Sequence, residues 1–370
     1  MKLVVNRDLF TRALSRIQGV LSRKATLPVL SNVLLEAKTS GSLKVAATDL
    51  DVTYDGQLAC RIDEPGKLTV DGKRLFEVVR SLPGEEVSME VSEEERLIIR
   101  CKNTEFILHG TSADSYPPLP DTSGVKLVPI DGVVLRELLE RTMLSVSTDE
   151  SRPNLNGVFF HCLGEGRIRM VSTDGHRLSQ GERSAEMGAD IPARDGVIIP
   201  RKGVSELKRL LDEIGKEVNF GFLDNNLVLA AENLSLFIRL IDAAFPDYGP
   251  VIPKSSERVV TLDRVPFLGS LKRIGLLASE RTHGIRIELR QNRMILSSDN
   301  PDLGKAREEV DVEYDGGDLI IAFNARYVRD ILGILSAPKV DMALNEALSP
   351  GLFREHGSDD YLFVVMPMRI

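Results

Sequence analysis

The sequence predicts an α+β fold built from three similar domains, each with two strand–helix–strands units and antiparallel sheets. Two observations lead to this prediction: one aspartate landmark recurs at equal spacing, and helical and strand patterns flank it in the same order each time. Asp49, Asp174 and Asp299 lie 125 residues apart, and each follows an apolar strand pattern that ends in Thr or Ser. A chain of 370 residues is also long enough for two or three separate cores.

Six stretches with helical spacing are expected, two in each repeat. Their apolar residues recur three or four positions apart, as at Leu9, Ala13 and Ile17, which is the period of a helix with one buried face. The first helix of each repeat is expected within residues 6–21, 131–146 and 263–278. The second is expected within 71–82, 200–211 and 324–335. The residues at the N-cap positions of the first helices are Asn6, Asp131 and Asp263.

Short strands separated by turn residues follow the helices. The segments EEER (93–96) and DNN (224–226) are predicted hairpin turns, and the glutamates of the first are expected at a solvated tip. Each repeat closes on an aromatic or apolar residue followed by proline, in SYPPLP, AFPDYGPVIP and VVMPMRI. We therefore expect three domains, over residues 1–122, 123–252 and 253–370.

The bulk composition is typical of a soluble globular protein, with 42% apolar and 28% charged residues. No window approaches eighteen consecutive apolar residues, so no membrane span is expected. The three cysteines, Cys60, Cys101 and Cys162, are far apart and odd in number. A disulfide framework or a CxxC zinc site is therefore not expected, and a reducing cytoplasm fits the sequence.

The segment VSTDGHRLS (171–179) places Asp174, His176 and two serines within nine residues, as a hydrolase active site might require. A nucleophile and its base must meet at hydrogen-bond reach beside an oxyanion hole, whereas neighbouring side chains on one strand end point to opposite faces. The corresponding turns at Leu50–Asp51 and Asn300–Pro301 carry no histidine. A turn histidine is therefore favoured over a catalytic base, and a hydrolase using His176 and Asp174 remains the alternative.

Other chemistry finds little support in the sequence. There is no GxxxxGK[ST] loop, no strand-linked GxGxxG and no HExxH. Pro301 and Leu303 interrupt the acidic run 299–311 at positions where an EF-hand needs oxygen ligands. His161 and Cys162 are adjacent on a strand, so they face opposite ways. We expect no metal, no cofactor and no enzymatic activity.

Charge is distributed unevenly over an acidic chain of net charge −8. The six helical stretches, with the fourth carried to residue 214, hold 17 basic and 11 acidic residues, so they carry +6 and the rest of the chain −14. One interpretation is that helices simply favour Arg and Lys. The other is that the helices share a basic surface that touches phosphates without reading sequence, while acidic strands form the exterior.

Several motifs, taken with the three repeats, closely resemble the bacterial DNA sliding clamps, the β subunits of the replicative DNA polymerase III holoenzyme. The motifs are RKATLPVLSN (23–32), LNGV (155–158), TDGHRLS (173–179), PRKGVSEL (200–207), FPDY (245–248) and MPMR (366–369). The correspondence covers essentially the whole chain. It implies a DNA-clamp fold and a head-to-tail homodimer, a ring of six domains with helices lining the hole and sheets outside. Such a ring encircles duplex DNA, slides along it, and tethers the replicative polymerase, the clamp loader and other clamp-binding proteins.

The resemblance also implies a role for TDGHRLS as one wall of a pocket that takes a short peptide with apolar anchors. Aliphatic and Met side chains suit such a pocket because they adapt to varied partners. Carried over by motif, the pocket residues are Leu155, Thr173, Gly175, His176, Arg177, Leu178, Pro246, Val251, Ser349, Val364, Val365, Met366, Pro367, Met368 and Arg369.

The resemblance further implies DNA contacts and a dimer seam. The expected DNA-binding residues are Lys24, Lys73, Arg74, Arg152 and Lys202. The expected seam places Phe106 and Leu108 of one chain against Leu276 and Leu277 of the other, unless these residues are ordinary core. A third reading of the whole chain is a repeat-built scaffold that binds partner peptides without DNA.

Overall fold

The computed structural model describes residues 1–21, 27–184 and 196–369, and it divides the chain into two compact units. Unit 1 takes in the described residues of Met1–Arg136 and Lys202–Leu240. Unit 2 takes in those of Glu137–Ala185, Pro192–Arg201 and Ile241–Ile370. Among the described residues, no helix is both long and apolar enough to span a membrane.

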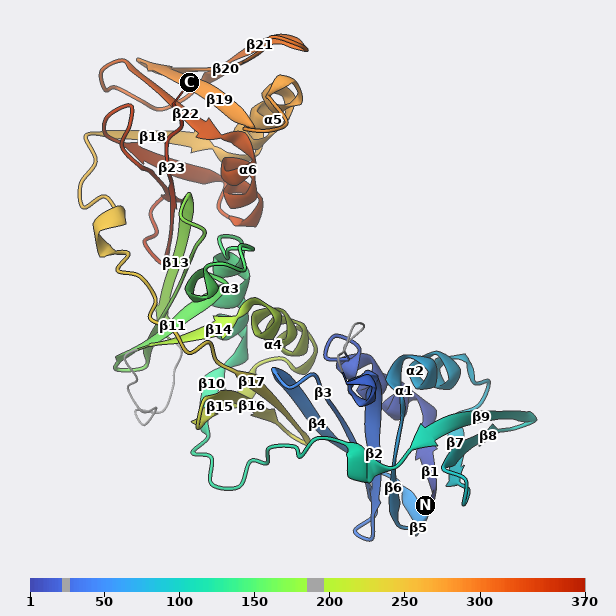
Figure 1. The fold of residues 1–370 in the computed structure, drawn as a ribbon. Helices are drawn as coiled ribbons and strands as arrows, with labels where there is room; N and C mark the ends of the chain where they lie inside the picture. Colours follow the sequence, from blue (N-terminus) through green and yellow to red (C-terminus); the bar gives the residue numbers. More distant parts are fainter. Residues whose placement is uncertain (22–26, 185–195, 370) are drawn as a thin grey trace. The chain divides into compact units, whose positions relative to one another are not determined.

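Six α-helices form within the six stretches expected from apolar spacing, and the fourth runs three residues further than its expected stretch (Figure 1). In each, the apolar stripe faces the strands, and residues such as Phe10, Leu75 and Val328 are fully buried. The helices are α1 (Arg7–Ile17), α2 (Gly72–Ser81), α3 (Gly132–Met143), α4 (Arg201–Ile214), α5 (Arg264–Ile274) and α6 (Ala325–Ile334).

Two of the three expected N-caps bond as a cap should. The Asn6 carboxamide oxygen accepts the backbone N–H groups of Asp8 and Leu9, at 3.0 and 3.1 Å. The Asp131 carboxylate likewise accepts two N–H groups of the first turn of α3. Asp263 lies at the N-cap of α5 but its side chain makes no capping bond. One reason is that Pro266, the third residue of α5, has no N–H to donate.

Unit 1 contains one sheet of thirteen strands. Its strands, in spatial order, are β10 (Val128–Asp131), β15 (Glu217–Leu223), β16 (Asn226–Ala231), β17 (Leu234–Arg239), β4 (Val52–Ala59), β3 (Ser42–Thr48), β2 (Asn32–Lys38), β6 (Gly66–Asp71), β9 (Thr104–Thr111), β8 (Arg96–Cys101), β7 (Glu86–Val91), β1 (Lys2–Asn6) and β5 (Arg61–Glu64). Every pairing is antiparallel. Alternate residues along β3 and β8 are buried against the helices, as expected for a sheet with one covered face.

Unit 2 contains an eight-stranded and a four-stranded sheet, both antiparallel. The first runs β14 (Val197–Pro200), β11 (Gly157–Gly164), β12 (Arg167–Thr173), β13 (Arg177–Ser184), β25 (Tyr361–Val365), β24 (Gly351–Glu355), β23 (Lys339–Leu344) and β18 (Arg258–Asp263). The second runs β21 (Gly304–Asp311), β20 (Arg293–Asn300), β19 (Gly284–Arg290) and β22 (Leu319–Asn324).

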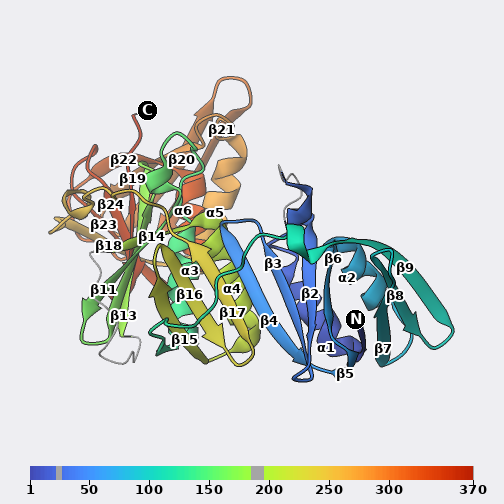
Figure 2. The same ribbon diagram turned by 60° about the horizontal axis from the view of Figure 1, so that its bottom comes forward.

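Two strand pairs join one repeat to the next. In unit 1, β17 of the middle repeat pairs with β4 of the first, and Figure 2 shows them side by side. In unit 2, β25 of the last repeat pairs with β13 of the middle one. The predicted domain boundaries near residues 122 and 252 fall between β9 and β10 and between β17 and β18. We call these two joined edges the internal seams.

The aspartate landmarks are equivalent in two repeats but not in the third. Asp49 and Asp174 both cap a tight turn, where each carboxylate accepts two backbone N–H groups at 2.7–3.1 Å. Asp299 instead lies within β20, and the turn carboxamide is that of Asn300. The prediction of three equivalent aspartates was therefore wrong by one residue, because alternate strand residues face opposite sides and only Asn300 stands on the equivalent face.

Both predicted hairpin turns are confirmed. The tip between β7 and β8 is exposed at Glu93 to Glu95, and β15 turns into β16 through Asp224 and Asn225. Glu95 and Asp224 have φ of 56° and 50°, the left-handed region that tight turns require.

Candidate functional site

The turn that carries TDGHRLS is held by its own polar side chains. The Asp174 carboxylate accepts the N–H groups of His176 and Arg177, at 2.9 and 3.0 Å. The Thr173 hydroxyl accepts the N–H of Gly175 and donates to the Arg177 carbonyl. Gly175 has φ of 89°, where a side chain would be strained. Asp174 is therefore committed to the turn, while the His176 ring is exposed.

The serines of the segment lie away from this turn chemistry. Ser172 is fully buried and its hydroxyl bonds the carbonyl of Thr142. Ser179 is also buried and shares a hydrogen bond of 2.7 Å with Ser145. Both hydroxyls thus complete the packing between strand and helix α3, which leaves the hydrolase alternative without an exposed serine beside His176.

Arg177 connects the turn to helix α6. Its Nε donates to Asp174 at 3.1 Å and its Nη1 to Asp330 at 2.8 Å. Its guanidinium also lies 4.4 Å from the ring centre of Tyr327, a cation–π distance. Burial raises the pKa of Tyr327, and Asp174 raises it further while Arg177 opposes the rise. Only 13% of the Arg177 side chain is exposed, so the arginine acts as a fixed post in the wall of the site.

An apolar cluster lies on the other face of the same strands. Leu178 pairs across to Val364 of β25, and both are buried together with Val171. Six half-buried side chains pack on these three, namely Phe159, Phe245, Tyr248, Ile252, Leu352 and Leu362. Because residues two apart on a strand share a face, this cluster forms the floor on which the expected pocket residues stand.

Aromatic rings extend the floor toward the FPDY segment. Phe159 and Phe245 stack at 4.9 Å between centres, and Tyr248 meets Phe245 edge-on at 6.1 Å. Tyr248 also lies within 3.5 Å of an Arg169 nitrogen that donates to its hydroxyl. The sequence reasoning missed Phe159 and Tyr248. The alternation of β11 and the three-residue spacing of Phe245 and Tyr248 could have indicated them.

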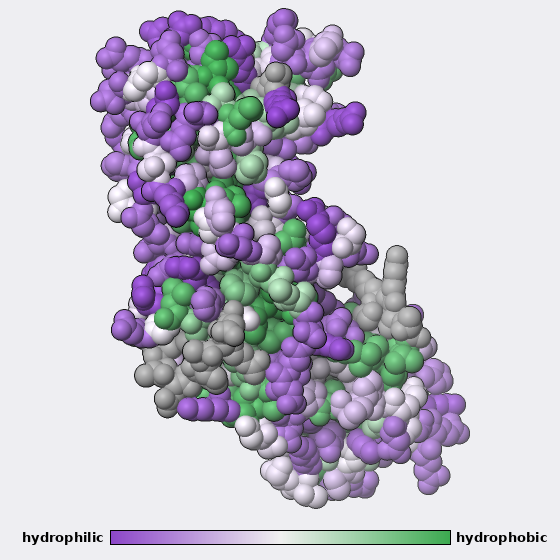
Figure 3. All heavy atoms as spheres, turned by 60° about the vertical axis from the view of Figure 1, so that its left-hand side comes forward, coloured by the Kyte–Doolittle hydropathy of each residue, from purple (hydrophilic) through white to green (hydrophobic). Residues whose placement is uncertain are grey.

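The remaining expected pocket residues divide by exposure. Leu155 and Val365 are buried, and Val365 shares the face of Arg177 rather than that of the apolar cluster. Met368 bonds through its N–H to the carbonyl of Ala322, and Met366 to that of His176. The half-buried members are Ser349, Pro367 and Met368, and the exposed ones are Pro246, Val251, Met366 and Arg369. On the face drawn in Figure 3, hydrophobic side chains gather in small groups between hydrophilic ones.

Comparison with family models decides the family. Three models match in succession: the DNA polymerase III beta subunit N-terminal domain over residues 1–120, its central domain over 129–247 and its C-terminal domain over 250–369. The chain belongs to the DNA polymerase III beta subunit family. A "Beta sliding clamp" of Caulobacter vibrioides is 34% identical over 376 residues, with all of both chains covered.

Solved structures of the same family share the fold over its whole length. The DNA polymerase III subunit beta of Pseudomonas aeruginosa superimposes with a TM-score of 0.93 at 34% identity, covering 100% of each chain. A second Pseudomonas aeruginosa sliding clamp, bound to griselimycin, gives the same TM-score, identity and coverage. The expected three-domain DNA-clamp fold is thereby confirmed.

The expected DNA-contacting residues of this beta subunit differ in how free they are. Lys24 lies outside the described residues. Lys202 donates to the Asp49 carboxylate and to the Val20 carbonyl, and Arg152 pairs with Asp149 at 2.9 Å. Lys73 is 71% exposed, with only a 3.9 Å pair to Glu77, and Arg74 is exposed.

Helical cations that sequence reasoning did not single out are as free as Arg74. Six exposed basic residues on the helices make no ion pair with any residue the structure describes: Arg12, Arg74, Arg80, Lys272, Arg326 and Arg329. Other helical cations are engaged, as Arg16 is with Glu213 at 2.9 Å. Sequence alone could not separate the two groups, because the partners come from distant elements.

The residues expected at a dimer seam are accessible in the single chain. Phe106 and Leu108 on β9 are half-buried, and Ile107 between them is 53% exposed. Leu276, just after α5, is 76% exposed. Such exposure is unusual for large apolar side chains, and it argues against the alternative that these residues are ordinary core.

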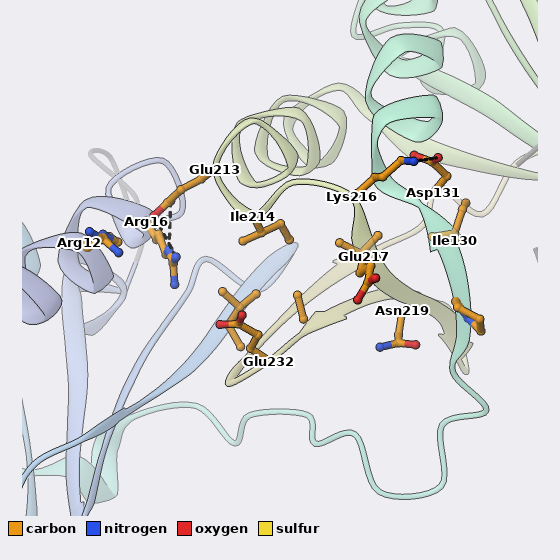
Figure 4. A pocket seen from close by; sticks show the side chains of 14 residues that line it. Arg12, Arg16, Ile130, Asp131, Glu213, Ile214, Lys216, Glu217, Asn219 and Glu232 are labelled. Carbon is orange, nitrogen blue, oxygen red and sulfur yellow. Dashed lines mark hydrogen bonds and ion pairs between the residues drawn. The ribbon is translucent and has the colours of Figure 1, made fainter. Parts of the chain in front are cut away.

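A large open hollow lies elsewhere, beside α1 and α4 of unit 1. It encloses about 1240 Å³ and shares no residue with the expected peptide pocket. Figure 4 shows its charged side chains paired across it, Arg16 with Glu213 and Lys216 with Asp131. With its carboxylates and cations neutralising one another, the hollow offers no concentrated charge for a ligand, and we assign none.

Proposed function

We propose that this chain is a processivity factor, a homodimeric ring that encircles duplex DNA, slides along it and tethers the replicative polymerase. The observation that carries the proposal is the repeated seam: each repeat ends in a strand that pairs with the next repeat, at β4–β17 and again at β13–β25. A chain joined in this way and matched throughout by the clamp family supports closure through a second copy. The ring has no catalytic role, and it works on DNA in the cytoplasm.

The domains of this ring are residues 1–122, 123–252 and 253–370 of each chain. The first and third each contain their two helices with the strands those helices cover. The middle one is linked by strand pairing to both neighbours, so a chain cut at the boundaries keeps its seams only where β17 and β25 are retained.

DNA contact is assigned to the exposed helical cations that have no internal partner. A cation free of carboxylates can take the place of counterions on a phosphate, and such contacts carry no sequence information. Lys73, Arg74 and Arg12 fit this role best in unit 1, whereas Lys202 and Arg152 already hold carboxylates.

Clamp-binding proteins are assigned to the apolar floor around Leu178 and Val364 with its rim of Pro246, Val251 and Met366. Exposed Met and Pro over a buried aliphatic floor suit apolar anchors of an extended peptide. His176 and Arg369 would supply polar edges.

Charge reversal tests the DNA assignment against the scaffold alternative. A chain carrying Arg12→Glu, Arg74→Glu and Arg326→Glu should load poorly on primed DNA, and the salt dependence of its DNA binding should weaken by roughly 0.9 per lost contact. The control carries Arg61→Glu, Arg96→Glu and Arg293→Glu, all on strands. Unchanged loading of the first chain would favour a scaffold that binds no DNA.

Ring closure is tested by mass in solution. The proposal expects about twice the 40.9 kDa of one chain. A stable monomer could not close the ring and would contradict the proposal. The hydrolase alternative is tested by His176→Ala, which should leave any hydrolysis unchanged if the histidine serves only the pocket rim.

A further inference from the structure

Two strands of the chain leave backbone edges open. Residues Thr104–His109 of β9 pair with β8 on one side, and β9 meets β6 only beyond them, at Gly110 and Thr111. Among the described strands, β21 pairs with β20 alone. Open edges of this kind expose unpaired N–H and C=O groups and are ready to add another strand.

Both open strands are repeats of strands that are paired within the chain. The β8–β9 hairpin has the same two-residue turn as β16–β17, with φ of 52° at Lys102 and 45° at Glu232. The β20–β21 hairpin repeats β12–β13, and the Ser298 hydroxyl bonds the end of α5 as the Ser172 hydroxyl bonds the end of α3. Thus β9 corresponds to β17, and β21 corresponds to β13.

We propose that β21 of one subunit pairs antiparallel with β9 of the partner subunit in the register of the two internal seams. This deepens the proposed ring, on which it rests. In those seams Leu178 opposes Val364, and Thr53 opposes Phe237. Counting from the shared turns, the corresponding residues are Lys305 on β21 and Ile107 on β9. Lys305 then opposes Ile107 of the partner subunit.

Burial supports this register. Phe237 and Val364 are 2% and 1% exposed because their seams cover them, whereas the corresponding Ile107 is 53% exposed. One residue along, Ser179 opposes Phe363 and bonds Ser145 beyond the end of α3. The equivalents are Ala306, Phe106 of the partner subunit and Leu277. The small Ala306 therefore leaves room for the phenyl ring beside Leu277.

Charge complementarity points the same way. The next position of the internal seams pairs Asp55 with Ser235 and Gln180 with Leu362. At the subunit seam this position pairs Arg307 with Glu105 of the partner subunit. The two side chains are 59% and 50% exposed in the single chain, so both can reach across.

The subunit seam lacks one contact that holds an internal seam. The position of Arg177, which binds Asp330, corresponds to Gly304, which has no side chain and a φ of 115°. The seam between subunits is therefore joined by strand pairing, Leu277 and an exposed ion pair, without a buried arginine. Of the junctions in the ring, this one should open first and should weaken as salt screens its charges.

A charge swap tests the register through the dimer dissociation constant, measured by sedimentation on dilution. Arg307→Glu and Glu105→Arg should each raise it about tenfold, because each places like charges opposite one another. The double variant should bring it back to within about threefold of the unaltered chain. Lys67→Glu, which removes an ion pair with Asp114 inside the chain, is the control and should leave it unchanged. Single variants without effect, or a double variant no better than the singles, would overturn the register.

Disulfide trapping gives a second readout in a chain whose three native cysteines are replaced by alanine. Lys305→Cys with Ile107→Cys should yield a covalent dimer on mild oxidation, because facing residues of antiparallel strands bring their Cβ atoms within disulfide reach. Lys305→Cys with Leu108→Cys should not, because Leu108 points to the other face. A dimer of the expected mass that links only through the second pair overturns the register and leaves the ring proposal intact. A monomer at every concentration contradicts the ring itself.

Discussion

Arg177 Nη1 donates to Asp330 Oδ2 over 2.8 Å, and this pair ties the TDGHRLS turn of the middle repeat to helix α6 of the last. Because the arginine also holds Asp174 and stacks on Tyr327, one side chain fixes the wall of the peptide site and an internal seam together.

Arg177→Ala should destabilise this seam. Two carboxylates lose a largely buried cation, so we expect the free energy of opening β13, measured by amide hydrogen exchange, to fall by about 2 kcal/mol. Arg167→Ala is the control, since Arg167 is 52% exposed in its pair with Glu182 and should cost less than about 1 kcal/mol. Equal losses in the two variants would show that the bridge to Asp330 contributes nothing special.

Tyr116 should make unit 1 sensitive to alkaline pH. Its hydroxyl accepts the Thr48 N–H at 3.1 Å, and burial raises the pKa of Tyr116 to about 12. A pKa raised above its unfolded value near 10 means that the stability is complete below pH 10 and is lost as pH rises toward 12, by roughly 2–3 kcal/mol.

The comparison with Tyr116→Phe isolates this effect. The variant leaves the Thr48 N–H without a partner, so it should be less stable by about 1–2 kcal/mol at pH 8. Its stability should change less than that of the unaltered chain between pH 10 and 12, so the gap closes. Parallel loss of stability in the two chains over that interval would rule the Tyr116 titration out.

Leu50 and Gly175 stand at the same position of the two equivalent turns, with φ of 79° and 89°. Leu50 is 51% exposed and so gains little from burial to offset its backbone strain. Leu50→Gly should leave the free energy of unfolding unchanged or raise it by up to about 1 kcal/mol, measured by urea titration. Gly175→Ala should lower it by about 1 kcal/mol. The reverse order would contradict the equivalence of the turns.

The N-caps of the last repeat should differ in value. Asn324 accepts two N–H groups of α6, whereas the Asp263 side chain makes no cap bond to α5. Asn324→Ala should cost about 1 kcal/mol in thermal or urea unfolding, and Asp263→Ala less than about 0.3 kcal/mol. Similar costs would show that charge near the helix start, rather than a hydrogen bond, stabilises α5.

The helices, the repeat order and the turns at Asp49 and Asp174 could be predicted from sequence, because apolar spacing and turn residues act locally. The equivalence of Asp299 could not, since the choice between Asp299 and Asn300 depends on which face of β20 meets α5. Arg177 was predicted as an edge of the site, but its partners Tyr327 and Asp330 lie 150 or more residues away and leave no local trace. The same holds for the acids that occupy Lys202 and Arg16.

The central claim, topological linkage to DNA, is tested most directly by retention on DNA with and without free ends. The protein is loaded on nicked circular DNA and separated from free protein by gel filtration, and half of the complex is then cut once with a restriction enzyme. The account predicts that the protein stays on the circle and is lost from the linear product, because a ring with weak contacts slides off an end. Equal retention on circle and line, or equal loss from both, would contradict it.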